Sequence, residues 1–171
     1  MTLGQYCILY PQYFTERECD IIEEIANQLN LEEGRIGNGE SDPDRPREEQ
    51  DGANDNFIRQ SDVKWLIHDI MPTEIGQKIT DGINQANVDA NWMFQWDHIE
   101  NHQYTIYRHR PDAEVTGDFY TWHTDSGSTP QSHGGRIRKL SSTIQLSYPD
   151  EYEGGHFQWI EPVGLFDKLK S

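Results

Sequence analysis

The segment GDFYTWHTDSG (117–127) places a histidine and an aspartate two positions apart, at His123 and Asp125. On an extended strand, residues i and i+2 project from the same face, so this imidazole and carboxylate can be directed at one point. A nitrogen and an oxygen ligand supplied in this way are two of the three ligands in the 2-His-1-carboxylate triad, which holds Fe(II) and leaves coordination positions open. By itself the pair is a weak signal in a chain with seven histidines, so the interpretation depends on its surroundings.

The residues around the pair form further blocks in a fixed order. Tyr107 precedes the pair on the segment QYTIYR, and the segment RKLSSTIQLS (138–147) follows it, before Pro149, Tyr152 and Gly154-Gly155. The block that carries the pair reads Gly-x-x-Tyr-x-x-His-x-Asp. Taken together, the four blocks resemble the signature of the prolyl 4-hydroxylase-like Fe(II)/2-oxoglutarate dioxygenases, especially the PKHD-type hydroxylases.

The resemblance covers residues 57–160 and implies a fold and an activity. The implied fold class is α+β or mainly β, a double-stranded β-helix (jelly roll) with N-terminal helices packed on the major sheet. The implied activity is hydroxylation of a C–H bond in a prolyl, peptidyl or small-molecule substrate, with succinate and CO2 as co-products. The implied cofactors are Fe(II) and 2-oxoglutarate, with ascorbate as an optional addition, and the other partner is dioxygen.

The resemblance also assigns roles to individual residues. His123 and Asp125 are the expected metal ligands, and Tyr107 falls where the family places a tyrosine that hydrogen-bonds 2-oxoglutarate. Strand alternation groups the side chains of the following block into a polar face and an apolar face. If the polar face lines the cavity, Thr143 and Gln145 lie near the co-substrate; the alternative is that this face is the outer surface.

Three more residues have two interpretations each. Arg138 either lies at the mouth of the site or pairs with a surface carboxylate. Tyr120 and Trp122 are either packing aromatics or walls of a substrate groove.

The family pattern also requires a second metal histidine on a late strand, followed by a basic residue that anchors 2-oxoglutarate. The sequence has neither in the expected place before Ser171. Three hypotheses follow. The third ligand and the basic residue lie beyond Ser171; or His156 substitutes as a ligand; or the barrel has lost catalysis and serves as a binding or assembly module.

Composition narrows the class of protein further. A chain of 171 residues fits a single domain. Its net charge of −16 opposes binding to phosphate backbones and anionic lipid, so neither nucleic acid nor a membrane surface is an expected partner. The first 14 residues do not resemble a signal peptide, no apolar run is long enough to span a bilayer, and Cys7 and Cys19 do not make a disulfide framework. We therefore expect a cytoplasmic protein.

Local patterns predict the elements that position these residues. A capping box at Thr15 begins a helix with apolar residues at helical spacing. A second helix is expected from Pro72 to Ala86, with Ile75, Ile79 and Ile83 on one face. Residues 32–56 are expected to form a polar, acidic loop. Strands are expected over residues 5–14, 57–67, 92–109, 118–125, 138–149 and 154–162.

Overall fold

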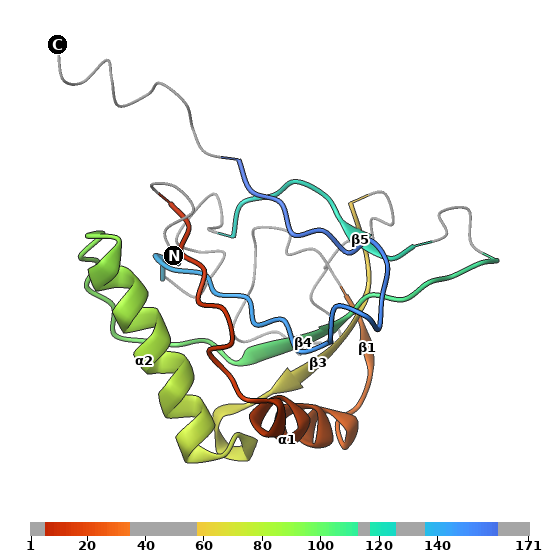
Figure 1. Cartoon of the computed structure of the whole chain (residues 1–171), viewed down its shortest axis with the longest axis horizontal. Coiled ribbons are helices and arrows are strands. Elements are labelled where there is room, and N and C mark those ends of the chain that lie inside the picture. The colour runs from red at the N-terminus through yellow and green to blue at the C-terminus, as the bar shows by residue number, and fades with distance from the viewer. Residues whose placement is uncertain (1–5, 35–57, 113–116, 126–135, 161–171) are drawn as a thin grey trace, which may run out of the picture.

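A computed structural model of the chain describes residues 6–34, 58–112, 117–125 and 136–160 (Figure 1). Within these ranges, two helices accompany two small antiparallel sheets, and no helix is long and apolar enough to cross a membrane. In chain order the elements are α1 (Glu16–Asn27), β1 (Glu32–Glu33), β2 (Arg59–Gln60), β3 (Asp62–Leu66), a short 3-10 helix (His68–Ile70), α2 (Thr73–Asp89), β4 (His102–Ile106) and β5 (Phe119–Tyr120).

Helix α1 begins where the sequence predicts it. The Thr15 hydroxyl accepts a hydrogen bond from the Glu18 backbone N–H, and the Glu18 carboxylate accepts one from the Thr15 N–H, which completes the capping box. Ile22 and Ala26 are buried, so the apolar face of the helix packs inward. The predicted capping box and buried face are both confirmed.

Helix α2 also confirms its prediction, with Pro72 at the N-cap position. The helix extends to Asp89, three residues beyond the predicted end. Ile75 and Ile79 are buried, and Ile83 packs against them at the edge of the core. The apolar residues that repeat at helical spacing along α2 therefore belong to the core.

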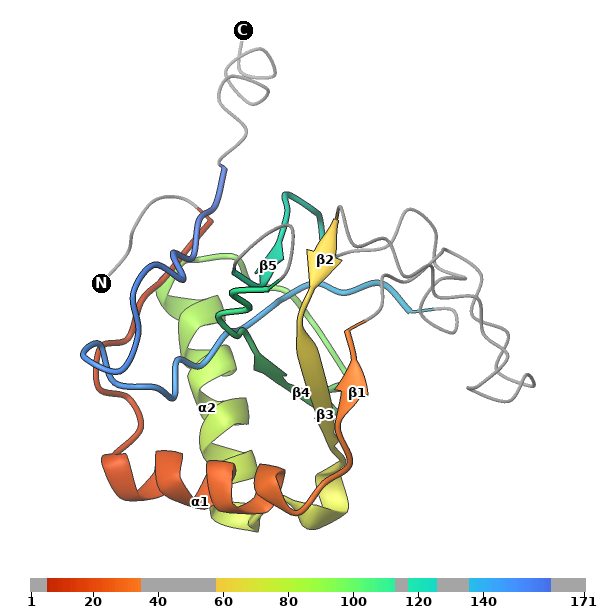
Figure 2. The ribbon, with the colours of Figure 1, turned by 90° about the vertical axis from the view of Figure 1, so that its right-hand side faces the viewer.

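The larger sheet has the order β1-β3-β4, and the smaller one pairs β2 with β5. Leu66, at the end of β3, packs in one cluster with Ile22 of α1, Met71, and Ile75 and Ile79 of α2. The two helices and the larger sheet thus share one core around β3 (Figure 1). The chain passes from β2 to β3 with only Ser61 between them and changes sheets there, as Figure 2 shows.

Several predicted strands are only partly formed in the described ranges. Residues 57–67 yield β2 and β3, residues 92–109 yield β4, and residues 118–125 yield β5. The predictions for the described parts of 5–14, 138–149 and 154–162 are wrong, because no strand is assigned there. Alternating apolar residues indicate a buried face, but a strand also needs a hydrogen-bonded neighbour.

The strand predicted over residues 92–109 begins only at His102, and residues 90–94 show why. Asn91 and Met93 adopt positive φ angles of 54° and 56°, which reverses the chain after α2. The buried Asn87 amide fixes this reversal by bonding both the N–H and the C=O of Phe94, at 3.0 and 2.8 Å.

Of the predicted loop 32–56, Glu32 and Glu33 form β1, and residues 35–56 lie outside the described ranges.

An ion pair between the helices predicts a pH dependence of stability. Lys78 of α2 donates to both Glu18 oxygens, at 2.9 and 2.7 Å. This bond, with the Thr15 bonds, lowers the pKa of Glu18 from 4.5 to about 2. Because the folded-state pKa lies below the unfolded-state pKa, the contribution of Glu18 is complete above pH 4.5 and is lost as the pH falls toward 2.

The measurement is the melting temperature of the wild type and of Glu18→Gln between pH 2 and pH 6. We expect the wild type to melt at higher temperature near pH 6 and the difference to shrink as the pH falls. Lys78→Met should lose the largest part of this pH-dependent contribution, since Lys78 is the first cause of the pKa shift and the Thr15 bonds remain. Parallel curves for the wild type and Glu18→Gln would contradict this account.

Candidate functional site

The strand pair β2–β5 positions the segment that carries His123 and Asp125. Arg59 lies opposite Tyr120 in this antiparallel pair, and the Thr121 N–H extends the pairing by donating to the Ile58 carbonyl at 2.8 Å. Strand β5 ends at Tyr120, so residues 121–125 leave the sheet rather than continue as the predicted strand.

The two predicted metal ligands nevertheless converge. His123 Nε2 lies 3.1 Å from Asp125 Oδ1, and both side chains are partly exposed. The other ring nitrogen, Nδ1, lies 2.7 Å from the Thr121 carbonyl oxygen. A carbonyl oxygen only accepts hydrogen bonds, so this contact places a proton on Nδ1.

With this proton on Nδ1, Nε2 is the ring nitrogen that faces the Asp125 carboxylate. A neutral imidazole protonated at Nδ1 presents a lone pair at Nε2, and a lone pair beside a carboxylate oxygen at 3.1 Å is unfavourable. The contact becomes favourable when a proton on Nε2 or a metal cation lies between the two groups. A backbone carbonyl on the far nitrogen is also the usual partner of a metal-binding histidine.

The separation of these two atoms fits adjacent ligands of one octahedral ion. Metal–ligand bonds of about 2.1 Å at right angles put the ligand atoms about 3 Å apart, and the Nε2–Oδ1 distance is 3.1 Å. In the described residues, no group of three His, Cys, Asp or Glu gathers to hold a metal, and His156 is exposed. His123 and Asp125 are therefore two candidate ligands, and no third candidate joins them among the described residues.

Arg138 holds the backbone of Asp125 in place. Its Nη1–H donates to the Asp125 carbonyl oxygen at 2.9 Å, while Nε and Nη2 donate to the two carboxylate oxygens of Glu100. These bonds with Glu100 raise the pKa of the Arg138 guanidinium, so it stays charged. The sequence left two roles open for Arg138; the structure shows the ion pair, with Glu100 as a partner that no local pattern indicates.

Tyr107 lies one residue beyond β4 and near the Arg59–Tyr120 pair. Burial raises the pKa of its hydroxyl above the ordinary value, although 51% of the residue's surface is exposed. The positive charge of Arg59 acts on the same hydroxyl and lowers its pKa, while Tyr120 and Asp118 raise it. The net effect keeps the hydroxyl protonated, so that it can donate a hydrogen bond to a carboxylate.

An ion-pair network anchors the start of the same segment. The Asp118 side chain is completely buried; it accepts from Arg110 Nε and Nη2 and from the Arg108 backbone N–H. Arg108 Nε also donates to Asp62 of β3 at 2.7 Å. Burial opposes ionisation of Asp62, but Arg108 and Arg110 together lower its pKa below the ordinary value. Sequence reasoning missed this network, because it joins residues that no local pattern connects.

The segment 138–147 shows the predicted alternation without forming a strand. Ile144 and Leu146 pack against the core, and Thr143 and Gln145 point away from it and are exposed. Of the three residues predicted for the apolar face, Ile144 and Leu146 are confirmed, whereas Leu140 is half-buried and is not among the residues packed against this core. A role for Thr143 and Gln145 near a co-substrate stays a prediction.

Trp122, the residue before His123, lies against the segment that follows Gly154-Gly155. It is 60% exposed and lines an open pocket of about 320 Å³ with Phe157, Gln158 and Trp159. Tyr120 instead packs face to face with the His123 ring. The sequence left open whether Tyr120 and Trp122 pack or line a groove. In the structure Trp122 lines a pocket, and Tyr120 packs on His123.

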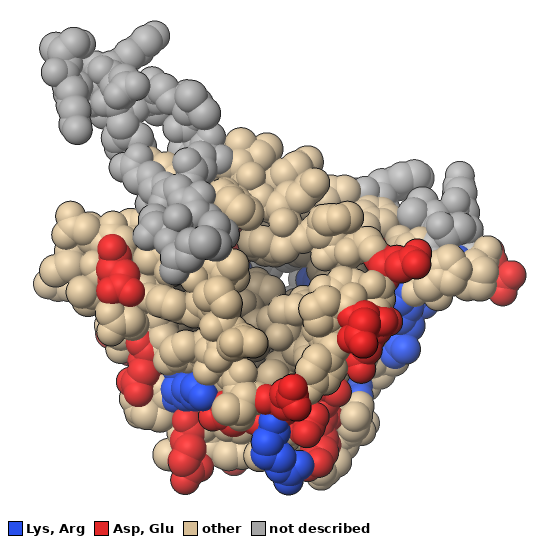
Figure 3. All heavy atoms as spheres, viewed as in Figure 1, with Lys and Arg blue, Asp and Glu red and all other residues tan. Residues whose placement is uncertain are grey.

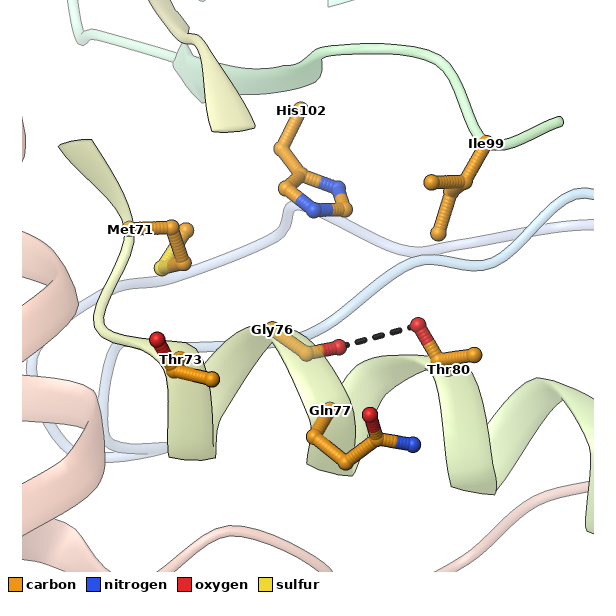
Figure 4. A pocket seen from close by; sticks show the side chains of 7 residues that line it. All are labelled: Met71, Thr73, Gly76, Gln77, Thr80, Ile99 and His102. Carbon is orange, nitrogen blue, oxygen red and sulfur yellow. Dashed lines mark hydrogen bonds between the residues drawn. The ribbon is translucent and has the colours of Figure 1, made fainter. Parts of the chain in front are cut away.

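A separate cavity of about 260 Å³ lies between α2 and β4 (Figure 4). The His102 ring projects into it from β4, and the Thr80 hydroxyl across from it donates to the Gly76 carbonyl within the helix. The cavity shares no residue with the predicted site; its lining consists of Met71, Thr73, Gly76, Gln77, Thr80, Ile99 and His102.

Comparison of the chain with protein-family models, with curated proteins and with solved structures finds no match. The functional interpretation therefore depends on the motif residues and on their contacts: the His123 imidazole, bonded to the Thr121 carbonyl, lies against the Asp125 carboxylate, and Arg138 bonds the Asp125 backbone carbonyl.

Proposed function

We propose that the chain is an Fe(II)- and 2-oxoglutarate-dependent oxygenase with a jelly-roll fold, which hydroxylates a C–H bond of a prolyl, peptidyl or small-molecule substrate. The observation that carries this proposal is the contact between His123 Nε2 and Asp125 Oδ1, with Nδ1 bonded to the Thr121 carbonyl. The overall reaction combines substrate, 2-oxoglutarate and dioxygen and yields hydroxylated substrate, succinate and CO2.

The residues have distinct roles in this proposal. His123 and Asp125 would hold the metal, and Arg138 keeps the Asp125 backbone in place. Bound Fe(II) would supply the dioxygen chemistry that the protein side chains lack. The protonated Tyr107 hydroxyl would donate to a carboxylate of 2-oxoglutarate, with the positive charge of Arg59 nearby. The third ligand would come from outside the described residues.

The surface next to the pair suits an uncharged or apolar substrate group. Trp122, Phe157 and Trp159 present aromatic rings to an open pocket beside the His123 segment. The net charge of −16 opposes a polyanionic substrate for the chain as a whole, and Figure 3 shows acidic side chains along the α1 side of the visible face, interspersed with a few basic ones.

The test is an anaerobic titration of the 171-residue chain with Fe(II) and 2-oxoglutarate. Chelation of the 2-oxo acid gives a visible metal-to-ligand charge-transfer band, which we expect in the wild type and not in His123→Ala. His98→Ala is the matched control, because His98 is exposed and outside the site, and this variant should keep the band. A wild type without the band would show that these 171 residues do not form the site by themselves, which contradicts an oxygenase complete within this chain and favours a binding or assembly module.

A further inference from the structure

A stack of three side chains runs from the sheet to the candidate ligand His123. The Arg59 guanidinium carbon lies 4.7 Å from the centre of the Tyr120 ring. The His123 ring lies parallel to the Tyr120 ring, with ring centres 3.6 Å apart and an angle of 11° between the planes. The β2–β5 register explains the first contact, since Arg59 and Tyr120 are directly opposite each other.

The stack and the Thr121 bond restrict the His123 ring in two different ways. Stacking on Tyr120 fixes the plane of the ring. The bond from Nδ1 to the Thr121 carbonyl fixes which edge of the ring points outward. Together they direct Nε2 at the Asp125 carboxylate, although the imidazole is partly exposed and lies beyond the last strand.

The far end of the stack is anchored within the fold. Arg59 is buried, with Nε donating to the Ser61 hydroxyl and Nη2 donating to Gln103 Oε1 of β4, both at 2.8 Å. Gly34 packs against the same place: a Cβ there would overlap the Ser61 hydroxyl and lie 2.8 Å from Arg59 Nε. Arg59 therefore connects both sheets to the Tyr120 ring.

From these contacts we propose that Arg59 and Tyr120 are positioning residues for His123, which hold its imidazole in the one orientation and tautomer suited to metal binding. Neither residue is itself a candidate metal ligand. This inference rests on the proposed function, because it assigns a purpose to the orientation of a candidate metal ligand. Its two parts, ring orientation and metal affinity, are measured separately.

Ring orientation is measured by NMR on the metal-free 171-residue chain. Two-bond proton–nitrogen correlations report which ring nitrogen of His123 carries the proton, and His123→Ala identifies the signals. In the wild type we expect Nδ1 to be protonated. Tyr120→Phe keeps the ring and should give the same pattern, whereas Tyr120→Leu removes the stacking surface and should give a mixture of tautomers.

Metal affinity is measured with Co(II) as the probe, by its visible absorption. Changes next to a metal-binding histidine typically reduce affinity 10- to 100-fold, so we expect Tyr120→Leu to bind about tenfold more weakly than the wild type. Tyr120→Phe should bind within about twofold of the wild type. Arg59→Lys keeps the charge but not the flat guanidinium, so its Co(II) affinity should lie between those of Tyr120→Phe and Tyr120→Leu.

Two results would overturn the inference. One is a wild-type His123 that is not protonated at Nδ1. The other is a folded Tyr120→Leu variant whose tautomer and Co(II) affinity match the wild type. A wild type with the expected tautomer but no metal binding would refute the proposed function and leave the positioning role of the stack intact.

Discussion

Leu66→Ala is expected to lower the free energy of unfolding by about 3 kcal/mol, within the range seen when a buried leucine is truncated. Leu66 is 2% exposed and lies where β3 meets both helices. Truncation removes the transfer free energy of the lost carbons and leaves a cavity among Ile22, Ile75 and Ile79, which helical backbones cannot readily fill.

Urea denaturation followed by circular dichroism measures this loss. The matched control is Leu31→Ala, because Leu31 is half exposed (50%) and should cost less than about 1 kcal/mol. Similar losses for the two variants would place the main core elsewhere. Because His123 and Asp125 lie outside this cluster, the proposed Fe(II) binding should be unchanged in the folded Leu66→Ala protein.

The features that sequence analysis predicted correctly are local ones. The Thr15 capping box joins residues three positions apart, and Pro72 marks the start of α2 by its own backbone restriction. The stripe that includes Ile75 and Ile79 repeats within one helix. Each of these signals is complete within a few residues, so no knowledge of the rest of the fold is needed to interpret it.

The sequence predicted that the two candidate ligands lie together, but the contacts that bring them together are not the ones it indicated. Strand alternation predicted that His123 and Asp125 converge, and their side chains do meet, but β5 ends before them. Their positions depend instead on Arg59 through the stack and on Glu100 through Arg138. Both partners are distant in sequence, and only the pairing of strands and segments brings them near. A single sequence does not reveal that pairing.

The extended segments illustrate a second limit. In 138–149 the alternation correctly placed Ile144 and Leu146 toward the core. It could not reveal whether another strand lies alongside, because hydrogen bonding between strands involves the backbone, which is the same for every residue type except proline. Burial patterns and strand formation are therefore separate predictions, and here only the first was right.

Arg110→Met is the second change for which we expect a large effect, about 2 kcal/mol of lost stability. Removing one partner of a buried ion pair costs about 3–5 kcal/mol, and we expect less here because Arg110 is partly exposed. The Asp118 carboxylate is 0% exposed, and without Arg110 its remaining described donor is the Arg108 backbone N–H. Methionine keeps most of the apolar stem, so the loss measures the missing charge and hydrogen bonds.

Arg108→Met is the matched control. Arg108 is nearly half exposed and pairs with Asp62, so its loss should cost at most about 1 kcal/mol. Asp118 begins the segment that continues through β5 to His123, and the Asp118 N–H donates to the Arg108 carbonyl, a contact that both variants keep. Arg110→Met should therefore loosen the anchor of the candidate site and weaken Fe(II) and 2-oxoglutarate binding in the folded protein, unlike Leu66→Ala. Equal losses of stability in the two arginine variants, or unchanged binding in Arg110→Met, would show that the buried Asp118 pair does not anchor this segment.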